Sequence, residues 1–191
     1  LTDDDNTANR FAADLRGFSE RDVVQLPSRE LVMADVVGVS RGYEQRRLAA
    51  LDELTEAHFA VASVQAAAQR TMPPEALKAA IVSLATGETA PLDELTHALT
   101  RAGYERCVQV EGTGQFSIRG GILDVFPPQA EHPYRVEFWD DEIDSISTFD
   151  VGSQRRLEQC ECLRCLPCME SIPALAKGGA AGLAKAVLAL T

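Results

Sequence analysis

The chain has 191 residues, 46% of them hydrophobic, with a formal net charge of −11 and a sequence pI of about 4.7. This length predicts two modest domains, and the acidic balance disfavours a groove for duplex DNA, because phosphates are repelled by such a surface. Apolar runs are too short to cross a bilayer, and Leu1 is followed by Asp3, Asp4 and Asp5 rather than by a leader. We therefore expect a cytoplasmic protein with no membrane partner. Because Leu1 is not Met, we also expect a piece of a longer protein.

The first part of the chain is predicted to be an α/β layer. Two helices and two buried strands are expected to alternate, over residues 6–16, 23–27, 40–54 and 59–64. This alternation is typical of a partial parallel sheet. The paired prolines of Thr71–Pro74 break it, so we predict a first domain of residues 1–75.

The second part is predicted to be α+β and mostly antiparallel, over residues 76–166. A helix from Pro91 to about Gly103 is marked by acids in its first turn and a glycine after its end. Strand patterns follow at 105–111, 115–119, 121–126, 134–139, 143–149 and 157–166. Residues 167–191 are expected to return to the first domain, with a helix over 173–190.

The stretch FSIRGGILDVFPP, residues 116–128, places two glycines inside an apolar run. A phosphate loop would need a following helix and usually a Lys, and neither pattern is present, so we do not expect one. A tight turn between two strands is the simplest interpretation. A glycine-flattened surface around Arg119, open to a partner, is compatible with that turn.

Two clusters raise the question of a metal site. The carboxylates of WDDEID, residues 139–144, are scattered by strand alternation, and Asp140–Asp141 fits a hairpin turn better. Four of the five cysteines lie close together, at positions 160, 162, 165 and 168. They could bind zinc in a stabilising structural module, although such pairs are usually farther apart, and we also consider reduced thiols filling a strand.

The segment GYERCVQVEGTGQFSIRGGILDVFPPQAEHPYRVEFWDDEIDSISTFD, residues 103–150, resembles a known strand-rich domain. The bacterial excision-repair protein UvrB shares this domain with the transcription-repair coupling factor family, Mfd. The segments FDVGSQRRLE and LPSRELVMADVVGVSRGYEQRRLAAL resemble the coupling factors rather than UvrB. The resemblance covers nearly the whole chain and identifies it as similar to the N-terminal UvrB-like module of that family.

The resemblance implies a non-catalytic interaction module that recruits the damage-recognition ATPase UvrA to stalled RNA polymerase. It also implies a parent protein that is an ATP-dependent DNA translocase, using ATP and Mg and contacting RNA polymerase and DNA through other domains. No P-loop motif is present in this sequence, so we expect no cofactor in this chain. The alternative is a UvrB-type, nucleotide-dependent module that handles damaged DNA.

By position, the resemblance implies that Arg106, Arg119 and Glu137 bind UvrA. One arginine of the UvrB pattern falls on Ser117, so that contact is missing or replaced, and Phe126 is a further candidate as an apolar anchor. The residues support this choice independently, because residues 104–150 hold three arginines among ten acids, and Arg is enriched at interface hot spots. The alternative is that Arg119 pairs with Glu137 only to hold the sheet.

Overall fold

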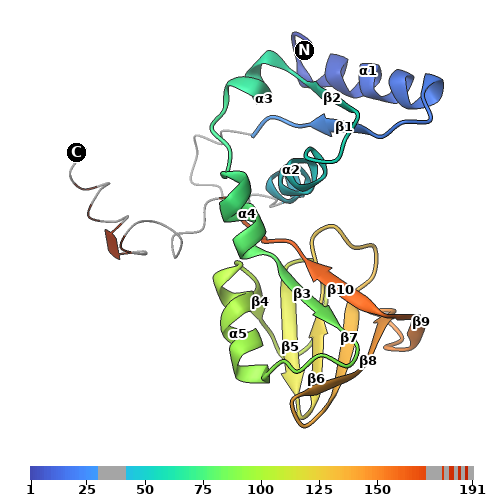
Figure 1. The fold of residues 1–191 in the computed structure, drawn as a ribbon, viewed down its shortest axis with the longest axis vertical. Coiled ribbons are helices and arrows are strands. Elements are labelled where there is room, and N and C mark those ends of the chain that lie inside the picture. The colour runs from blue at the N-terminus through green and yellow to red at the C-terminus, as the bar shows by residue number, and fades with distance from the viewer. Residues whose placement is uncertain (30–41, 171–177, 179–180, 183–184, 186–187, 189–191) are drawn as a thin grey trace. The chain divides into compact units, whose positions relative to one another are not determined.

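The computed structural model describes residues 1–29, 42–170, 178, 181–182, 185 and 188. The chain divides into two compact units, Leu1–Leu77 (unit 1) and Lys78–Thr191 (unit 2), whose elements are labelled in Figure 1. Among the described residues, the helices are too short or too polar to span a membrane.

Unit 1 is built on two parallel strands. Val23 pairs with Phe59 and Leu26 with Ala62. Its elements are α1 (Asp5–Phe18), β1 (Val23–Leu26), α2 (Gly42–Glu53), β2 (Phe59–Ala62) and α3 (Val64–Ala68), and α4 (Pro74–Ala80) runs across the division between the units.

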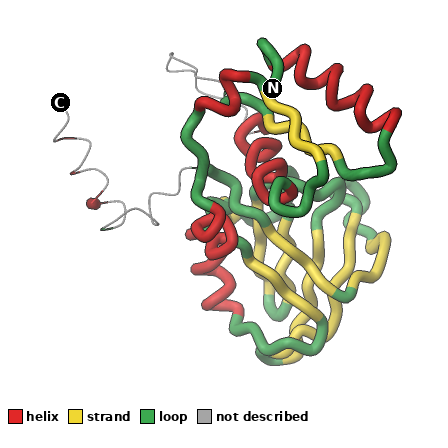
Figure 2. Tube along the Cα trace, turned by 45° about the horizontal axis from the view of Figure 1, so that its top comes forward, coloured by secondary structure: helices red, strands yellow, loops and turns green. Residues whose placement is uncertain are grey.

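Helices pack on both faces of this small sheet, as Figures 1 and 2 show. On one face, the small residues Ala8 and Ala12 of α1 let that helix lie against Val23 and Val61. On the other face, Ala50 of α2 joins a second buried cluster with residues of β1. Successive residues of β1 therefore pack against two different helices, as in other parallel α/β layers.

Unit 2 is dominated by a six-stranded sheet in the order β4-β5-β6-β7-β8-β9. Its pairs are antiparallel except for the parallel pair of β4 with β5. The strands are β4 (Glu105–Arg106), β5 (Gln115–Arg119), β6 (Ile122–Val125), β7 (Tyr134–Trp139), β8 (Glu142–Phe149) and β9 (Arg156–Cys160). A separate antiparallel pair joins β3 (Val82–Ala85) to β10 (Cys162–Cys165), and α5 spans Leu92–Arg101.

Two tight hairpins turn at the same end of the sheet. Gly120 and Gly121 connect β5 to β6, and only Gly120 has a positive φ, +60°, which fits a two-residue turn with glycine first. A Cβ on Gly121 would lie 3.1 Å from the carbonyl oxygen of Phe138, so this glycine permits close approach to β7. Asp140 and Asp141 connect β7 to β8, which confirms the predicted acidic hairpin turn.

The core of unit 2 lies on one face of the large sheet. Phe116, Leu123 and Val136 point into it from three neighbouring strands and are fully buried. They pack against Leu99 of α5 and against Leu163 of β10. Because strand residues alternate between faces, the residues between them in sequence lie on the opposite face.

The structure confirms the fold class expected from the sequence, a small parallel layer followed by a mostly antiparallel, strand-rich region. One expected strand is wrong in extent, because residues 157–166 form two strands that pair in different sheets. The strand expected over 105–111 is limited to Glu105–Arg106. The Cys107 N–H still donates to the Phe116 carbonyl of β5, but the next carbonyl, that of Val108, accepts a hydrogen bond from the Ser117 hydroxyl. The start of the helix expected over 40–54 and most of the helix expected over 173–190 lie outside the described residues.

Candidate protein-binding face

The face of the six-stranded sheet opposite the core carries a row of charged and hydroxyl side chains. We call it the arginine face. Cross-strand register and alternation assign to it Ser117, Arg119, Asp124, Arg135, Glu137 and Ser145, and Arg156 reaches it from β9. Helix α5 packs against the other face, so within the described part of unit 2 no helix lies over these side chains.

A buried carboxylate lies at the centre of this face. Asp124 is only 2% exposed, and its two oxygens accept hydrogen bonds from two arginines. Arg119 Nη2 donates to Oδ2 at 2.8 Å, while Arg135 donates through Nε to Oδ1 at 2.7 Å and through Nη2 to Oδ2 at 2.9 Å. The bidentate contact is the strong form of this pairing. Two positive groups and one negative group leave the cluster with a net positive charge.

The two arginines differ in how firmly they are held. The guanidinium of Arg135 also lies 4.4 Å from the ring centre of Phe149, and its Nη2 donates to Gln154 Oε1 at 3.1 Å. Hydrogen bonding to Asp124 raises the pKa of Arg135. Its side chain is 19% exposed, compared with 50% for Arg119. Arg135 is thus part of the framework, and Arg119 faces solvent.

Glu137 lies beside this cluster but belongs to a different pair. Its carboxylate accepts a hydrogen bond from the Ser145 hydroxyl at 2.8 Å and lies 2.8 Å from Arg156 Nη2. The suggested pairing of Arg119 with Glu137 is therefore wrong, because the partner of Arg119 is Asp124. Register explains the difference: the two-residue turn pairs Ser117 with Asp124, which places that carboxylate diagonally next to Arg119.

The environment of Glu137 gives unit 2 a measurable sensitivity to acid. The hydrogen bond from Ser145, followed by that from Arg156, holds the pKa of Glu137 below its ordinary value of 4.5. A lowered folded-state pKa stabilises the fold above the ordinary value, and this contribution is lost as the pH falls through the folded-state pKa. We expect Glu137→Gln to destabilise unit 2 at pH 7 and to have a smaller effect at pH 3, below the ordinary pKa of the carboxyl. Hydrogen exchange of the β7 and β8 amides at both pH values measures this difference, and an effect of equal size at both would contradict it.

The structure does not bring all four expected binding residues together. Arg119 and Glu137 share the arginine face. Arg106 lies on the edge strand β4 in register with Phe116, a core-facing residue; its side chain is exposed and its guanidinium forms no ion pair with any described residue. Phe126 is half-buried just beyond β6, where its backbone N–H donates to Gln115, at the far end of that strand from the glycine turn.

One exposed aromatic residue of this face, Trp139, was not among the binding residues expected from the sequence. Trp139 ends β7, two residues beyond Glu137 on the same face, and is 80% exposed. It lies at the hairpin end of the sheet, where the Gly120–Gly121 turn also lies. Strand alternation with Glu137 was the signal that could have identified it. A large exposed aromatic on a candidate binding face is a typical component of a binding hot spot.

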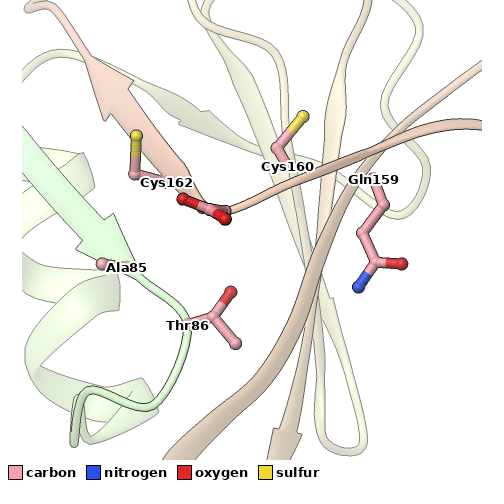
Figure 3. Close-up of a pocket in the computed structure, with 6 residues that line it drawn as sticks. Ala85, Thr86, Gln159, Cys160 and Cys162 are labelled. Carbon is pink, nitrogen blue, oxygen red and sulfur yellow. The ribbon is translucent and has the colours of Figure 1, made fainter.

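The four neighbouring cysteines do not converge on one point. Cys165 and Cys168 are buried in the core, whereas Cys160 is at its border and Cys162 is exposed. Cys160 and Cys162 line an open depression of about 710 Å³, together with Thr86 and Gln159. Figure 3 shows these four side chains. Within the described residues, no group of three or more potential ligands is arranged to hold a metal ion, so the zinc alternative gains no support there. None of the five cysteines is in a disulfide.

These environments predict selective thiol chemistry. Burial raises the pKa of Cys165 to about 12, so almost none of it is thiolate near pH 8, and the core also blocks access to it. We expect iodoacetamide to label Cys162 in the native protein and to label Cys165 only after unfolding. Peptide mass spectrometry over a time course measures both rates, with Cys162→Ser as the control. Equal labelling of the two residues in the native protein would contradict the assignment of Cys165 to the core.

The arginine face thus combines an exposed arginine and an exposed tryptophan with a framework of paired charges, which is the composition expected of a protein-binding surface. Residues 82–170 match the UvrB interaction domain family. The chain is 33% identical over 172 residues to the transcription-repair-coupling factor of Haemophilus influenzae, 36% over 169 residues to that of Bacillus subtilis and 37% over 164 residues to that of Mycobacterium bovis. These matches cover 81–89% of this chain and 13–15% of the relatives. The chain belongs to the transcription-repair coupling factor family, of which it represents the UvrB-like module.

Proposed function

We propose that this module binds UvrA through the arginine face and so recruits UvrA to stalled RNA polymerase. The observation that carries the proposal is the position of Arg119, half exposed at the glycine turn, on the face that α5 leaves uncovered. The family match over residues 82–170 supports an interaction role, and its name refers to UvrB-type interactions.

The contact set differs in part from the one that the resemblance implies. Arg119 and Glu137 lie on one face, and we include Trp139 as the apolar anchor of that face, since it lies closer to Glu137 along the sheet than Phe126 does. Arg106 contributes from the edge strand β4, and Phe126 from the end of β6. Arg156, itself half exposed, supplies a second cationic group.

For the whole protein we propose the family's activity. The chain spans 13–15% of the length of the relatives that it matches, so the motor lies outside it. The parent protein would be an ATP-dependent DNA translocase that uses ATP and Mg and contacts RNA polymerase and DNA through other domains. The module itself performs no reaction. Its net charge of −11 disfavours the alternative role of handling damaged DNA directly.

The test is a titration of this chain with purified UvrA, followed by two signals. Calorimetry gives the affinity, and the ¹⁹F NMR signal of fluorotryptophan reports on the face itself, because Trp139 is the only tryptophan in the chain. Saturable binding that shifts or broadens this signal supports the proposal. Binding that leaves the signal unchanged would place the contact elsewhere, and no binding at all would reject the function.

A further inference from the structure

The buried position of Asp124 is unusual for a residue on the arginine face. Carboxylates are seldom fully buried unless they are paired, and Asp124 as a whole residue is only 1% exposed. Both of its oxygens are occupied by guanidinium groups from the strands on either side. Asp124 therefore connects the framework arginine, Arg135, to the exposed arginine, Arg119.

The framework side of this connection is fixed by several independent contacts. Arg135 is held by both Asp124 oxygens, by the Phe149 ring and by Gln154. Gln154 is itself fixed, because its Nε2 donates to the carbonyl oxygen of Val151 at 2.8 Å. The carboxylate of Asp124 thus has one preferred position, set from the β7 side of the sheet.

On the β5 side, Asp124 accepts a hydrogen bond from only one nitrogen of the Arg119 guanidinium. A guanidinium has five N–H donors, and the contact at 2.8 Å engages Nη2 alone. The donors on Nε and Nη1 are not used by any described residue, and half of the side chain is exposed. Arg119 can accordingly keep its bond to Asp124 and still donate to an acidic group of a partner.

We propose that Asp124 is a positioning residue for partner binding, which holds the Arg119 guanidinium in its binding geometry before the partner arrives. This inference rests on the proposed function. Its physical basis is entropy, because ordering a long, rotamer-rich side chain at an interface opposes association. Removing the hydrogen bond from Arg119 to Asp124 is expected to weaken binding about three- to tenfold. This range corresponds to the entropy cost of ordering one long side chain at an interface.

The alternative is that Asp124 has only a structural role, which is to neutralise the charge of Arg135. This alternative predicts a different result. In that case its replacement would weaken binding by disturbing the sheet, whether or not Arg119 is present. A positioning residue acts only through Arg119. A double-mutant cycle separates these roles, because coupling between two residues appears as non-additivity.

The experiment uses the full chain with Asp124→Asn, Arg119→Ala and the double variant, each titrated with UvrA after its fold is checked by circular dichroism. Asp124→Asn is expected to weaken binding three- to tenfold alone and less than twofold in the Arg119→Ala background. An equal loss in both backgrounds overturns the proposal. No loss from Asp124→Asn, with a clear loss from Arg119→Ala, overturns it while leaving the proposed function intact.

The role of Asp124 can also be tested on the chain alone, by measuring the mobility of the Arg119 side chain. This test applies even if UvrA does not bind or if Asp124→Asn does not fold. NMR relaxation of the arginine Nε–Hε groups compares Arg119 with two internal references, the buried Arg135 and the exposed Arg106. In the wild-type chain Arg119 is expected to be ordered like Arg135, and in Asp124→Asn to be mobile like Arg106. Mobility like that of Arg106 in the wild-type chain overturns the positioning role, whatever UvrA does.

Discussion

Replacing Arg119 with Ala is expected to weaken the binding of UvrA by about 2 kcal/mol, or about thirtyfold, while unit 2 stays folded. The side chain is half exposed on the arginine face, so its loss removes donors offered to the partner. The cost in stability is expected to be less than about 1 kcal/mol, because the Arg119 side chain is itself half exposed and Asp124 keeps a second arginine partner. Asp124 is not left unpaired in this variant, since Arg135 still binds both of its oxygens.

The matched control for this variant is Arg101→Ala. Arg101 is also an exposed arginine, but it lies in the last turn of α5, on the opposite side of the sheet from the arginine face. Calorimetric titration should show the loss of affinity for Arg119→Ala only, and thermal unfolding should change little for either variant. A large fall in stability for Arg119→Ala with affinity intact would show that the arginine serves the fold instead of the partner.

Local patterns were sufficient for the strands that carry the arginine face. The strands predicted at 115–119 and 134–139 have those bounds in the structure, because each alternates apolar and polar residues and is bounded by turn residues. The Gly-Gly and Asp-Asp turns then fix the register of their neighbours. Strand β3 was not predicted, since Val82–Ala85 is a short stretch whose pairing partner, β10, lies about eighty residues away along the chain.

Parts of the candidate site depend on relationships between strands and not on any single stretch of the sequence. Counting charges indicated that Arg119 was exceptional, but its partner depends on which residues share a face across the hairpin. Strand residues alternate between the two faces of the sheet, and this alternation would have placed Trp139 on the same face as Glu137. The framework contacts of Arg135 to Phe149 and Gln154 depend on an irregular register between β8 and β9 and on the turn that follows β8. Such features come from long-range packing and have no simple local signal.

Replacing Phe116 with Ala is expected to destabilise unit 2 by about 3–5 kcal/mol, the usual cost of removing a fully buried phenylalanine. Phe116 has no exposed surface and lies in the core cluster, on β5 opposite Val125. Because a domain is typically stable by only about 5–15 kcal/mol, this loss is a large part of the total. Hydrogen exchange of the β5 to β8 amides, combined with denaturant unfolding, measures the change.

The same substitution is expected to reduce UvrA binding without touching the arginine face. Arg119 lies three residues beyond Phe116 on the same strand, so its position depends on the packing of β5 against the core. The apparent association constant should fall in proportion to the folded fraction of unit 2. Phe116→Leu, which keeps most of the buried volume, should recover much of both stability and affinity. Val108→Ala is the control, because Val108 is 87% exposed and its truncation should change stability by less than about 0.5 kcal/mol. Unchanged stability of Phe116→Ala would contradict the burial of this residue in the core.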